Sequence, residues 1–448
     1  MNTEFRVNDI GPIWPAARLL WMVVISALLA SGCATFHPVP LEQVSFTQRA
    51  ETKSKDGISV SVVVLSPEES EQAFGTPLAD KGIQPVWLRI ENSTDKEYLL
   101  LENNVDRNYF SPHEAAWKSH YFASGEANRA MNRYFLDQHI SPYIAPHRTV
   151  AGYVYTNLDE GIKYVAVDLL GYGAREYKSF WFVAEVPGLK ADYKQVDWDN
   201  LYPADEVVDF QDDQELRAWL ASLPCCALGG DEETPADPLN LVVVGKPGKT
   251  IAGFARRGWD VTETLHLGSL WVMIQSSLFG GRYRTSPVSP LYLFGRSQDI
   301  ALQKTRASVD ERNHLRLWLA PVRYQGMNVF VGQISRDIGI RLAAKTLVTH
   351  KIDPAVDEAR TYLALDLLAS ERLAAYGYVK GVGAAPLDDP RYNYTGDPYY
   401  TDGRRLVLIM ANERSDILDL ERLDWEPPLM PQSRAEENVM GPGDVVTE

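Results

Sequence analysis

Alternating apolar and polar residues run through the first part of the chain and predict a series of short β-strands. Val86, Leu88 and Ile90 share one face of such a strand, and Trp87, Arg89 and Glu91 share the other. Similar segments, separated by glycine and asparagine, cover residues 57–65, 150–156, 162–169 and 177–184. Residues 113–134 interrupt them with helical spacing. We therefore expect an immunoglobulin-like β-sandwich with a helical insertion over residues 34–190.

The pattern changes beyond this region. Residues 191–238 are predicted to form an acidic linker with a short amphipathic helix at 214–223. Between 239 and 412, strands mix with helices, and Asp353-Pro354 supplies an N-cap and a first-turn proline for the last long helix. This mixture predicts an α+β domain. Strands are expected at 239–245, 291–294, 300–304, 314–319, 329–335, 374–380 and 405–410, and helices at 250–257 and 267–278. The segment 413–448 is expected to be disordered.

An apolar segment near the N-terminus ends at a cysteine. The 11 residues Leu19–Leu29 are apolar, and Ala30-Ser31-Gly32 lead from them to Cys33. This run is shorter than the roughly 20 residues that span a bilayer, and small residues before a cysteine resemble the cleavage site of bacterial lipoproteins. An uncleaved signal anchor and a buried helix are the alternatives. The sequence thus predicts a signal peptide over 1–33 and lipidation (palmitate) of Cys33.

Lipidation would attach the mature chain to a membrane of the cell envelope, facing the periplasm. Ala34, directly after the cysteine, favours the outer membrane over the inner one.

The other cysteines, Cys225 and Cys226, are adjacent, so a bond between them would be strained. Two thiols and a redox-active disulfide both stay open.

Charge is distributed unevenly along the chain. Residues 240–380 contain 19 Lys and Arg against 11 Asp and Glu, a balance of +8 that leaves −24 for the remainder of a chain of net charge −16. Within 282–345 the counts are 11 and 4, or +7. A basic segment on an acidic protein indicates an anionic partner, although scattered solvated charge is the simpler alternative.

Familiar catalytic motifs are incomplete in this sequence. Gly245-Lys246-Pro247-Gly248 has two residues between its glycines where a phosphate-binding loop needs four, so we interpret it as a turn. His113-Glu114 begins like a zinc-protease helix, but Trp117 stands where the second histidine belongs. We predict no metal, no cofactor and no nucleic-acid partner.

A diffuse group of basic residues remains as the candidate site. In the strand predicted at 314–319, alternation places His314, Arg316 and Trp318 on one face and three leucines on the other, where a core is expected. The first face should look outward or into a cleft. The candidate anion-binding residues are Arg282, Arg296, Lys304, His314 and Arg316, and the candidate acid/base residues are His314, His350, Asp353 and Asp357.

Several ordered motifs in residues 205–412 resemble the LssY C-terminal domain family. They are Thr285–Asp299, Lys304, His314–Trp318, His350–Pro354 and Tyr399–Arg405. The resemblance implies no established activity and therefore no catalytic residues. In that family the domain also follows membrane modules that resemble lipid-phosphate phosphatases, and no such module is apparent here.

Two functions follow as hypotheses. The first is an envelope lipoprotein that binds or scaffolds an anionic lipid, a glycan or an envelope protein. The second is a hydrolase or transferase acting on phospho-ester or lipid-linked substrates, with His314 or His350 as general base. A shared pocket holding His314, Arg316 and Asp353 or Asp357 would favour catalysis, whereas an open face would favour binding.

Overall fold

The computed structural model describes residues 36–40, 43–122, 124–159, 162–172, 176–185, 196–262, 288–305, 312–343 and 347–426. Cys33, Arg282 and the helix predicted at 267–278 lie outside these ranges. Contacts divide the chain into two compact units: one comprises Met1–Leu158 and Val167–Phe180, and the other comprises Asp159–Ala166 and Trp181–Glu448.

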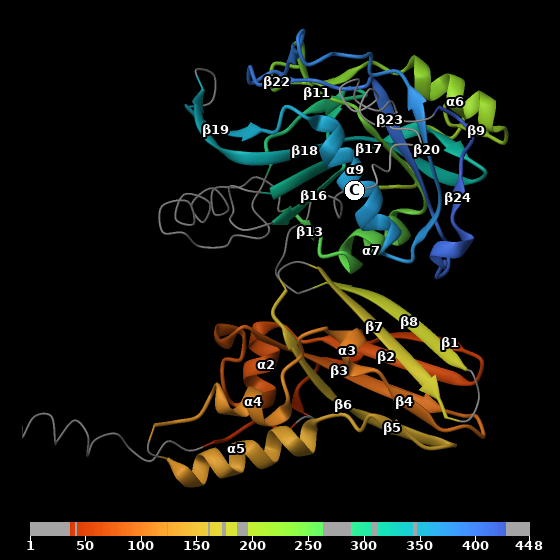
Figure 1. The fold of residues 1–448 in the computed structure, drawn as a ribbon. Helices are drawn as coiled ribbons and strands as arrows, with labels where there is room; N and C mark the ends of the chain where they lie inside the picture. Colours follow the sequence, from red (N-terminus) through yellow and green to blue (C-terminus); the bar gives the residue numbers. More distant parts are fainter. Residues whose placement is uncertain are drawn as a thin grey trace, which may run out of the picture. The chain divides into compact units, whose positions relative to one another are not determined.

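Two four-stranded sheets belong mainly to the first unit, and parts of β7 and β8 fall in the second (Figure 1). One has the order β1 (Glu51–Lys55), β2 (Ile58–Val64), β3 (Ile83–Asn92) and β6 (Arg148–Asn157), with every neighbouring pair antiparallel. The other has the order β5 (Tyr143–Ile144), β4 (Tyr98–Leu100), β7 (Ile162–Gly171) and β8 (Tyr177–Glu185). Val86, Leu88 and Ile90 are all fully buried, which confirms that they share one face of β3.

Short helices cover the other face of the first sheet. They are α2 (Pro67–Phe74), α3 (Glu102–Val105), α4 (Pro112–Trp117) and α5 (Gly125–Gln138), with the 3₁₀ helices η2 (Thr47–Arg49) and η3 (Ala79–Lys81). Phe74 of α2 and Phe135 of α5 pack against Tyr153 and Tyr155 of β6 in one core. The helical insertion predicted at 113–134 is therefore confirmed as α4 and α5.

The second unit is built on a mixed sheet of ten strands among the described residues. Its main order is β13 (Asp260–Val261), β16 (Ile300–Thr305), β17 (Arg312–Tyr324), β18 (Met327–Ala343), β12 (Leu241–Val244), β23 (Arg404–Met410), β20 (Leu373–Lys380) and β24 (Glu421–Arg422). β9 (Val208–Phe210) pairs with β17 and β19 (Leu347–Ile352) pairs with β18. The strands predicted in this region thus exist, and β17 and β18 are longer than expected.

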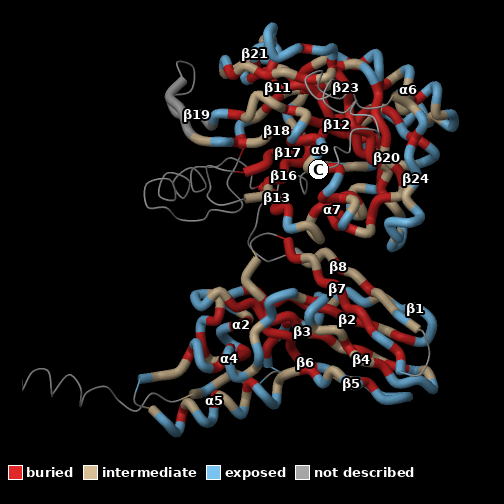
Figure 2. The backbone as a smooth tube through the Cα atoms, in the orientation of Figure 1, coloured by how far each residue is buried: buried red, intermediate tan, exposed pale blue. Residues whose placement is uncertain are grey.

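Helices cover both faces of this sheet. α7 (Pro247–Arg256) and α9 (Val356–Leu368) contribute Phe254, Leu363 and other residues to a core on one face, together with Leu315 and Leu317 of β17. α6 (Asp213–Ser222) packs on the other face through Leu216 and Leu220. The buried strands between these layers stand out in Figure 2. The chain is therefore a mixed, sheet-rich protein with several sheets and few helices.

Smaller elements surround the second face. A short sheet has the order β11 (Pro235–Pro238), β10 (Cys226–Leu228), β14 (Tyr292–Leu293) and β15 (Arg296–Ser297), and β21 (Arg391–Tyr392) pairs with β22 (Pro398–Tyr399). Cys225 and Cys226 form a disulfide at the start of β10. Arg405 donates hydrogen bonds to the main-chain carbonyls of Leu220, Leu223 and Pro224, just before the two cysteines. This buried cation thereby caps the last turn of α6, where carbonyls lack helical partners.

Two sequence predictions need correction here. The last long helix begins at Val356, not Pro354, because Ala355 is its N-cap and Asp353 instead accepts a hydrogen bond from the Ala355 amide. The segment after residue 412 keeps structure up to residue 426, since it contains η5 (Ile417–Asp419) and β24, and Leu423 is buried. Within the described ranges, no helix has both the length and the apolarity needed to cross a bilayer.

Candidate functional site

Strand β17 separates apolar from polar side chains in the predicted alternation. Leu315, Leu317 and Leu319 belong to the core under α7 and α9, which confirms the leucine face. His314, Arg316 and Trp318 lie on the opposite face, but they do not look outward as predicted, because His314 and Arg316 are only 6% exposed and Trp318 is fully buried. A polar strand face buried to this degree requires partners.

Neighbouring strands supply those partners. In the antiparallel register, Gln303 of β16 and Ser335 of β18 lie opposite His314, and Gln333 of β18 lies opposite Arg316. Together these side chains form what we call the polar cluster: Gln303, Arg312, His314, Arg316, Gln333, Ser335 and Asp337. Every member is at least nine-tenths buried. The cluster continues on the same sheet face as the second apolar core, so it occupies space that hydrophobic side chains would otherwise fill.

Asp337 is the acidic centre of the polar cluster. Its Oδ2 lies 3.3 Å from His314 Nε2 and 3.7 Å from Arg312 Nε, and Arg312 Nη1 donates a hydrogen bond to Gln303 Oε1 at 2.8 Å. Burial raises the pKa of Asp337 to about 7, although the charges of Arg312 and Arg316 act to lower it. A carboxyl group with this pKa exchanges its proton near neutral pH, which is a common property of functional sites.

The positive charge of the buried Arg316 is only weakly compensated by nearby carboxylates. Its guanidinium donates to the Ser289 carbonyl at 3.1 and 3.3 Å, and its nearest described carboxylate oxygen, Asp237 Oδ2, is 4.0 Å away. Burial lowers the pKa of Arg316, while Asp237 and Asp337 act to raise it. An additional anion at this position would therefore be stabilised electrostatically.

The polar side chain of Gln333 lacks hydrogen-bond partners within the described part of the chain. Its side chain is fully buried, and neither Nε2 nor Oε1 has a hydrogen-bond partner among the described residues. A buried amide without partners costs about 1–3 kcal/mol. Gln333 therefore offers a donor and an acceptor beside Arg316 for a bound polar group.

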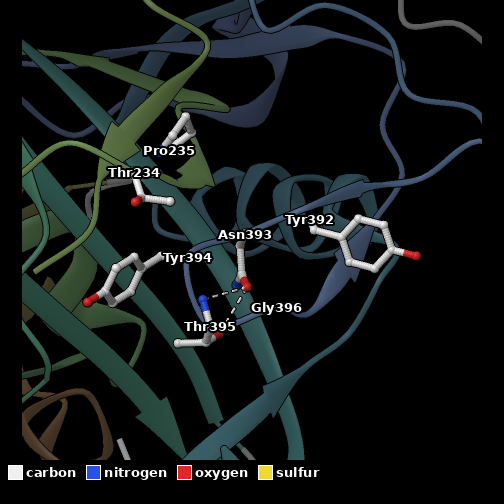
Figure 3. A pocket seen from close by; sticks show the side chains of 7 residues that line it. All are labelled: Thr234, Pro235, Tyr392, Asn393, Tyr394, Thr395 and Gly396. Atoms are coloured by element: carbon white, nitrogen blue, oxygen red, sulfur yellow. Dashed lines mark hydrogen bonds between the residues drawn. The ribbon is translucent and has the colours of Figure 1, made fainter. Parts of the chain in front are cut away.

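Asp237 links the polar cluster to a surface pocket. Asn393 Nδ2 donates to Asp237 Oδ1 at 2.8 Å, whereas Arg316 lies nearest to the other oxygen, Oδ2. Asn393 lines a pocket of about 530 Å³ together with Thr234, Pro235, Tyr392, Tyr394, Thr395 and Gly396 (Figure 3). The lining offers hydroxyl groups, an amide and tyrosine rings but no charged side chain.

Close approach of the backbones fixes β18 against β17 at the cluster. A Cβ added to Gly332 would lie 2.4 Å from the Arg316 carbonyl oxygen, so the position next to Gln333 requires glycine. On the other side, the Asn240 side chain exchanges hydrogen bonds with the main chain of Ile334 at 2.9 and 3.1 Å. These contacts hold Gln333 and Ser335 in register with His314 and Arg316.

Arg296 and Lys304 lie apart from the cluster in ion pairs of their own. Arg296 donates twice to Asp299, at 2.8 and 2.9 Å, and also to Tyr202 and the Leu319 carbonyl. Lys304 donates to both oxygens of Asp366, at 2.8 and 3.0 Å. Since Lys304 pairs with Asn313 in the register, it extends from the opposite sheet face to His314.

The acid/base candidates Asp353 and Asp357 also make their described hydrogen bonds outside the polar cluster. Asp357 accepts hydrogen bonds from Thr401 Oγ1 and the Asp402 amide at 2.8 and 2.7 Å, and burial raises its pKa. The Asp353 amide donates to the Arg336 carbonyl at 2.7 Å. His350 of β19 pairs with Ile340 of β18, and the side chain of His350 lies outside the description, as does Arg282. Thus His314 and Arg316 come together in one site, and neither Asp353 nor Asp357 contacts them through a described hydrogen bond or ion pair.

Most members of the polar cluster were not identified from the sequence. Gln303, Arg312, Gln333, Ser335 and Asp337 were not candidates, and neither was the adjacent Asp237, although a signal exists. Gln333, Ser335 and Asp337 alternate in a strand, and aspartate is disfavoured inside strands. A second strand with the same period of polar residues as 312–316 would have indicated a shared polar face.

The arrangement can bind an anion or transfer a proton. Two arginines and a histidine are suited to phosphate or carboxylate, and the contact of His314 with Asp337 resembles an oriented general base. Among the described residues, no three His, Cys, Asp or Glu side chains are grouped to hold a metal ion.

The region that contains this site matches one known protein family. No curated protein matches the chain. Residues 227–404, which span the polar cluster, the pocket and most of the ten-stranded sheet, match the family model of the LssY C-terminus.

Proposed function

We propose that the second unit binds an anionic group at the polar cluster, and that the chain is an envelope lipoprotein held at a membrane by a lipid on Cys33. Weak neutralisation of the buried Arg316 guanidinium is the observation that carries the binding proposal. The +7 balance of residues 282–345 supports it, since such a segment raises the local concentration of anions.

The ligand would be recognised through a phosphate or carboxylate group on an envelope lipid, a glycan or a protein. Arg316 would exchange its contact with the Ser289 carbonyl for a charge-assisted hydrogen bond to the ligand. Gln333 would complete the contacts with its amide. The two sheets of the first unit, proposed to be an immunoglobulin-like sandwich, would act as the scaffold between the lipid and this site.

Binding is tested with inorganic phosphate and with vesicles that contain phosphatidic acid. Arg316→Ala should weaken binding at least about tenfold, and the affinity of the wild-type protein should fall as salt rises. Arg323→Ala is the matched control, because Arg323 lies on the same strand but is exposed and outside the polar cluster. Equal binding by both variants, or binding that ignores salt, would refute the proposal.

Lipid attachment has its own test. Cells that express the chain and are fed labelled palmitate should label the wild-type protein, and Cys33→Ser should abolish the label. A labelled Cys33→Ser variant, or an unlabelled wild-type protein, would show that Cys33 is not the attachment site. We place the protein on the periplasmic side of the envelope, and Ala34 favours the outer membrane.

One observation supports a second candidate, hydrolysis of, or group transfer from, phospho-esters or lipid-linked substrates. The 3.3 Å contact between His314 and Asp337 would orient His314 as a general base, and Arg316 would stabilise developing negative charge. Turnover of a chromogenic phosphomonoester that His314→Ala abolishes and Arg323→Ala preserves would select this candidate. Binding without turnover would select the first.

A further inference from the structure

The helical hairpin of the first unit exposes three large apolar side chains. Trp117 at the end of α4 is 65% exposed, Phe122 between the helices is 94% exposed, and Leu136 of α5 is 63% exposed. We call the two aromatic members, Trp117 and Phe122, the aromatic patch. Large apolar side chains left in water on one element indicate an interaction surface.

The hairpin that carries the patch is firmly built. His120 Nε2 and Asn132 Oδ1 are 2.7 Å apart, and the Asn128 side chain bonds both the amide and the carbonyl of Tyr121, at 2.8 and 2.9 Å. Phe122 directly follows this clamp. The aromatic side chains are therefore presented on an ordered support, and little backbone entropy would be lost when they bind.

The start of the described chain packs onto the same hairpin. The Phe36 ring lies 5.6 Å from the ring of Tyr134 in α5, and the Val39 amide donates to the Gln72 carbonyl at 3.0 Å. Phe36 is three residues after Cys33, so the two Cα atoms can be at most about 11 Å apart. A lipid on Cys33 would hold α5 close to the bilayer surface.

Charge around the patch is balanced. The exposed basic residues of the two helices and their junction are Lys118, Arg129 and Arg133, and the exposed acidic ones are Glu114, Glu126 and Asp137. Three charges of each sign give no net attraction to anionic lipids. Contact with a membrane would depend on the aromatic rings, and tryptophan favours the headgroup region because its ring is apolar and its N–H is polar.

We infer that the aromatic patch inserts into the interfacial region of the membrane that holds the lipid anchor. This inference rests on the proposed lipid attachment at Cys33 for its orientation. It adds a second membrane contact, made by protein side chains, that fixes which face of the first unit meets the bilayer.

Flotation of the non-lipidated mature chain, beginning at Ala34, with phosphatidylcholine vesicles tests the inference. The wild-type chain should float with the vesicles, and it should still do so in about 1 M salt, where charge interactions are screened beyond about 3 Å. The double variant Trp117→Ala, Phe122→Ala should bind about tenfold or more weakly. A fluorophore placed by Phe122→Cys should shift to the blue when vesicles are added.

Leu387→Ala, Leu418→Ala is the matched control, because these side chains are 73% and 90% exposed but belong to the second unit. It should float like the wild type. An equal loss in both double variants, no flotation of the wild type, or an unshifted fluorophore would overturn the inference and leave a protein partner as the occupant. Because this chain carries no lipid, such a failure is distinguishable from a missing palmitate label.

Discussion

Two groups of buried arginine and aspartate in the second unit have the same residue types and opposite properties. Arg360 binds Asp402 through two hydrogen bonds of 2.8 and 2.9 Å and also donates to the Arg404 carbonyl. In the polar cluster, Arg312 Nε lies 3.7 Å from Asp337, and Arg316 lies 4.0 Å from Asp237 beside the cluster. The three arginines are all buried, so burial of the cation does not distinguish the two groups.

The pKa values of Asp402 and Asp337 shift in opposite directions. Burial acts to raise the pKa of Asp402, but hydrogen bonds and charge from Arg360 hold it below its usual value. Burial raises the pKa of Asp337 to about 7, because it outweighs the lowering effects of Arg312 and Arg316. A buried ion pair with close contacts is part of the framework, whereas one with loose contacts can still accept a ligand.

The largest loss of stability should follow from breaking the close pair of Arg360 and Asp402. Asp402→Ala leaves Arg360 buried without its bidentate partner, and we expect the second unit to lose about 3–5 kcal/mol of unfolding free energy. Denaturant unfolding measures this change, with the transition of the first unit as an internal control. A loss below about 1 kcal/mol would mean that the pair does not stabilise the framework.

A slightly smaller loss should come from forcing β17 and β18 apart at the polar cluster. In Gly332→Ala, the new methyl group meets a main-chain oxygen that cannot move away, so we expect a loss of about 2–3 kcal/mol. Gly248→Ala is the control, since nothing lies within 4 Å of its Cβ position in α7. That change should be neutral or stabilise by up to about 1 kcal/mol. Equal stabilities of the two variants would contradict the close approach.

The pH dependence of stability should have opposite signs in the two groups. With its pKa raised to about 7, folded Asp337 binds its proton more tightly than the unfolded chain does, so its contribution is complete below about pH 4 and is lost as pH rises to about 7. Relative to wild type, Asp337→Asn should therefore gain up to about 4 kcal/mol over this interval.

Asp402→Asn provides the opposing case. The lowered pKa of Asp402 stabilises the folded state above the unfolded pKa, and this contribution is lost as pH falls through the folded value. The unfolding free energy of this variant should therefore fall furthest below that of the wild type at neutral pH. Urea unfolding at several pH values measures both differences, and slopes of the same sign would invalidate the comparison.

The smallest effect on stability is expected at Arg316. Replacing it with a side chain of similar volume, as in Arg316→Met, should change the unfolding free energy by about 1 kcal/mol or less, because little compensation is lost. Binding of inorganic phosphate should still fall at least about tenfold. A large destabilisation, as expected for Asp402→Ala, would assign Arg316 to the framework and remove it from the site.

Local patterns predicted much of the fold. Alternation located β2, β3, β6, β16, β17, β20 and β23, and helical spacing located α4, α5, α6 and α7. Boundaries were less accurate where tertiary hydrogen bonds decide them. The turn at Asp353 delays α9 to Val356, and η5 and β24 form because the chain after residue 412 returns to pair with β20.

The candidate site was predictable only in part. Alternation within one strand correctly grouped His314 with Arg316, since neighbours at spacing two share a face. Nearness in sequence wrongly suggested that Lys304 and Arg296 would join them. Lys304 lies on the opposite face, and Arg296 is bound by Asp299, three residues away.

The sequence by itself determined which residues alternate, where an apolar segment precedes Cys33, and which face of β17 is leucine. These features depend on spacing along one chain segment. Only the tertiary structure decided that the polar face is buried, that Gln333 and Asp337 lie beside His314 and Arg316, and that Arg360 has a close partner where Arg316 does not. Pairing between distant strands sets those distances, and in a buried environment differences near 1 Å decide whether a charge is compensated.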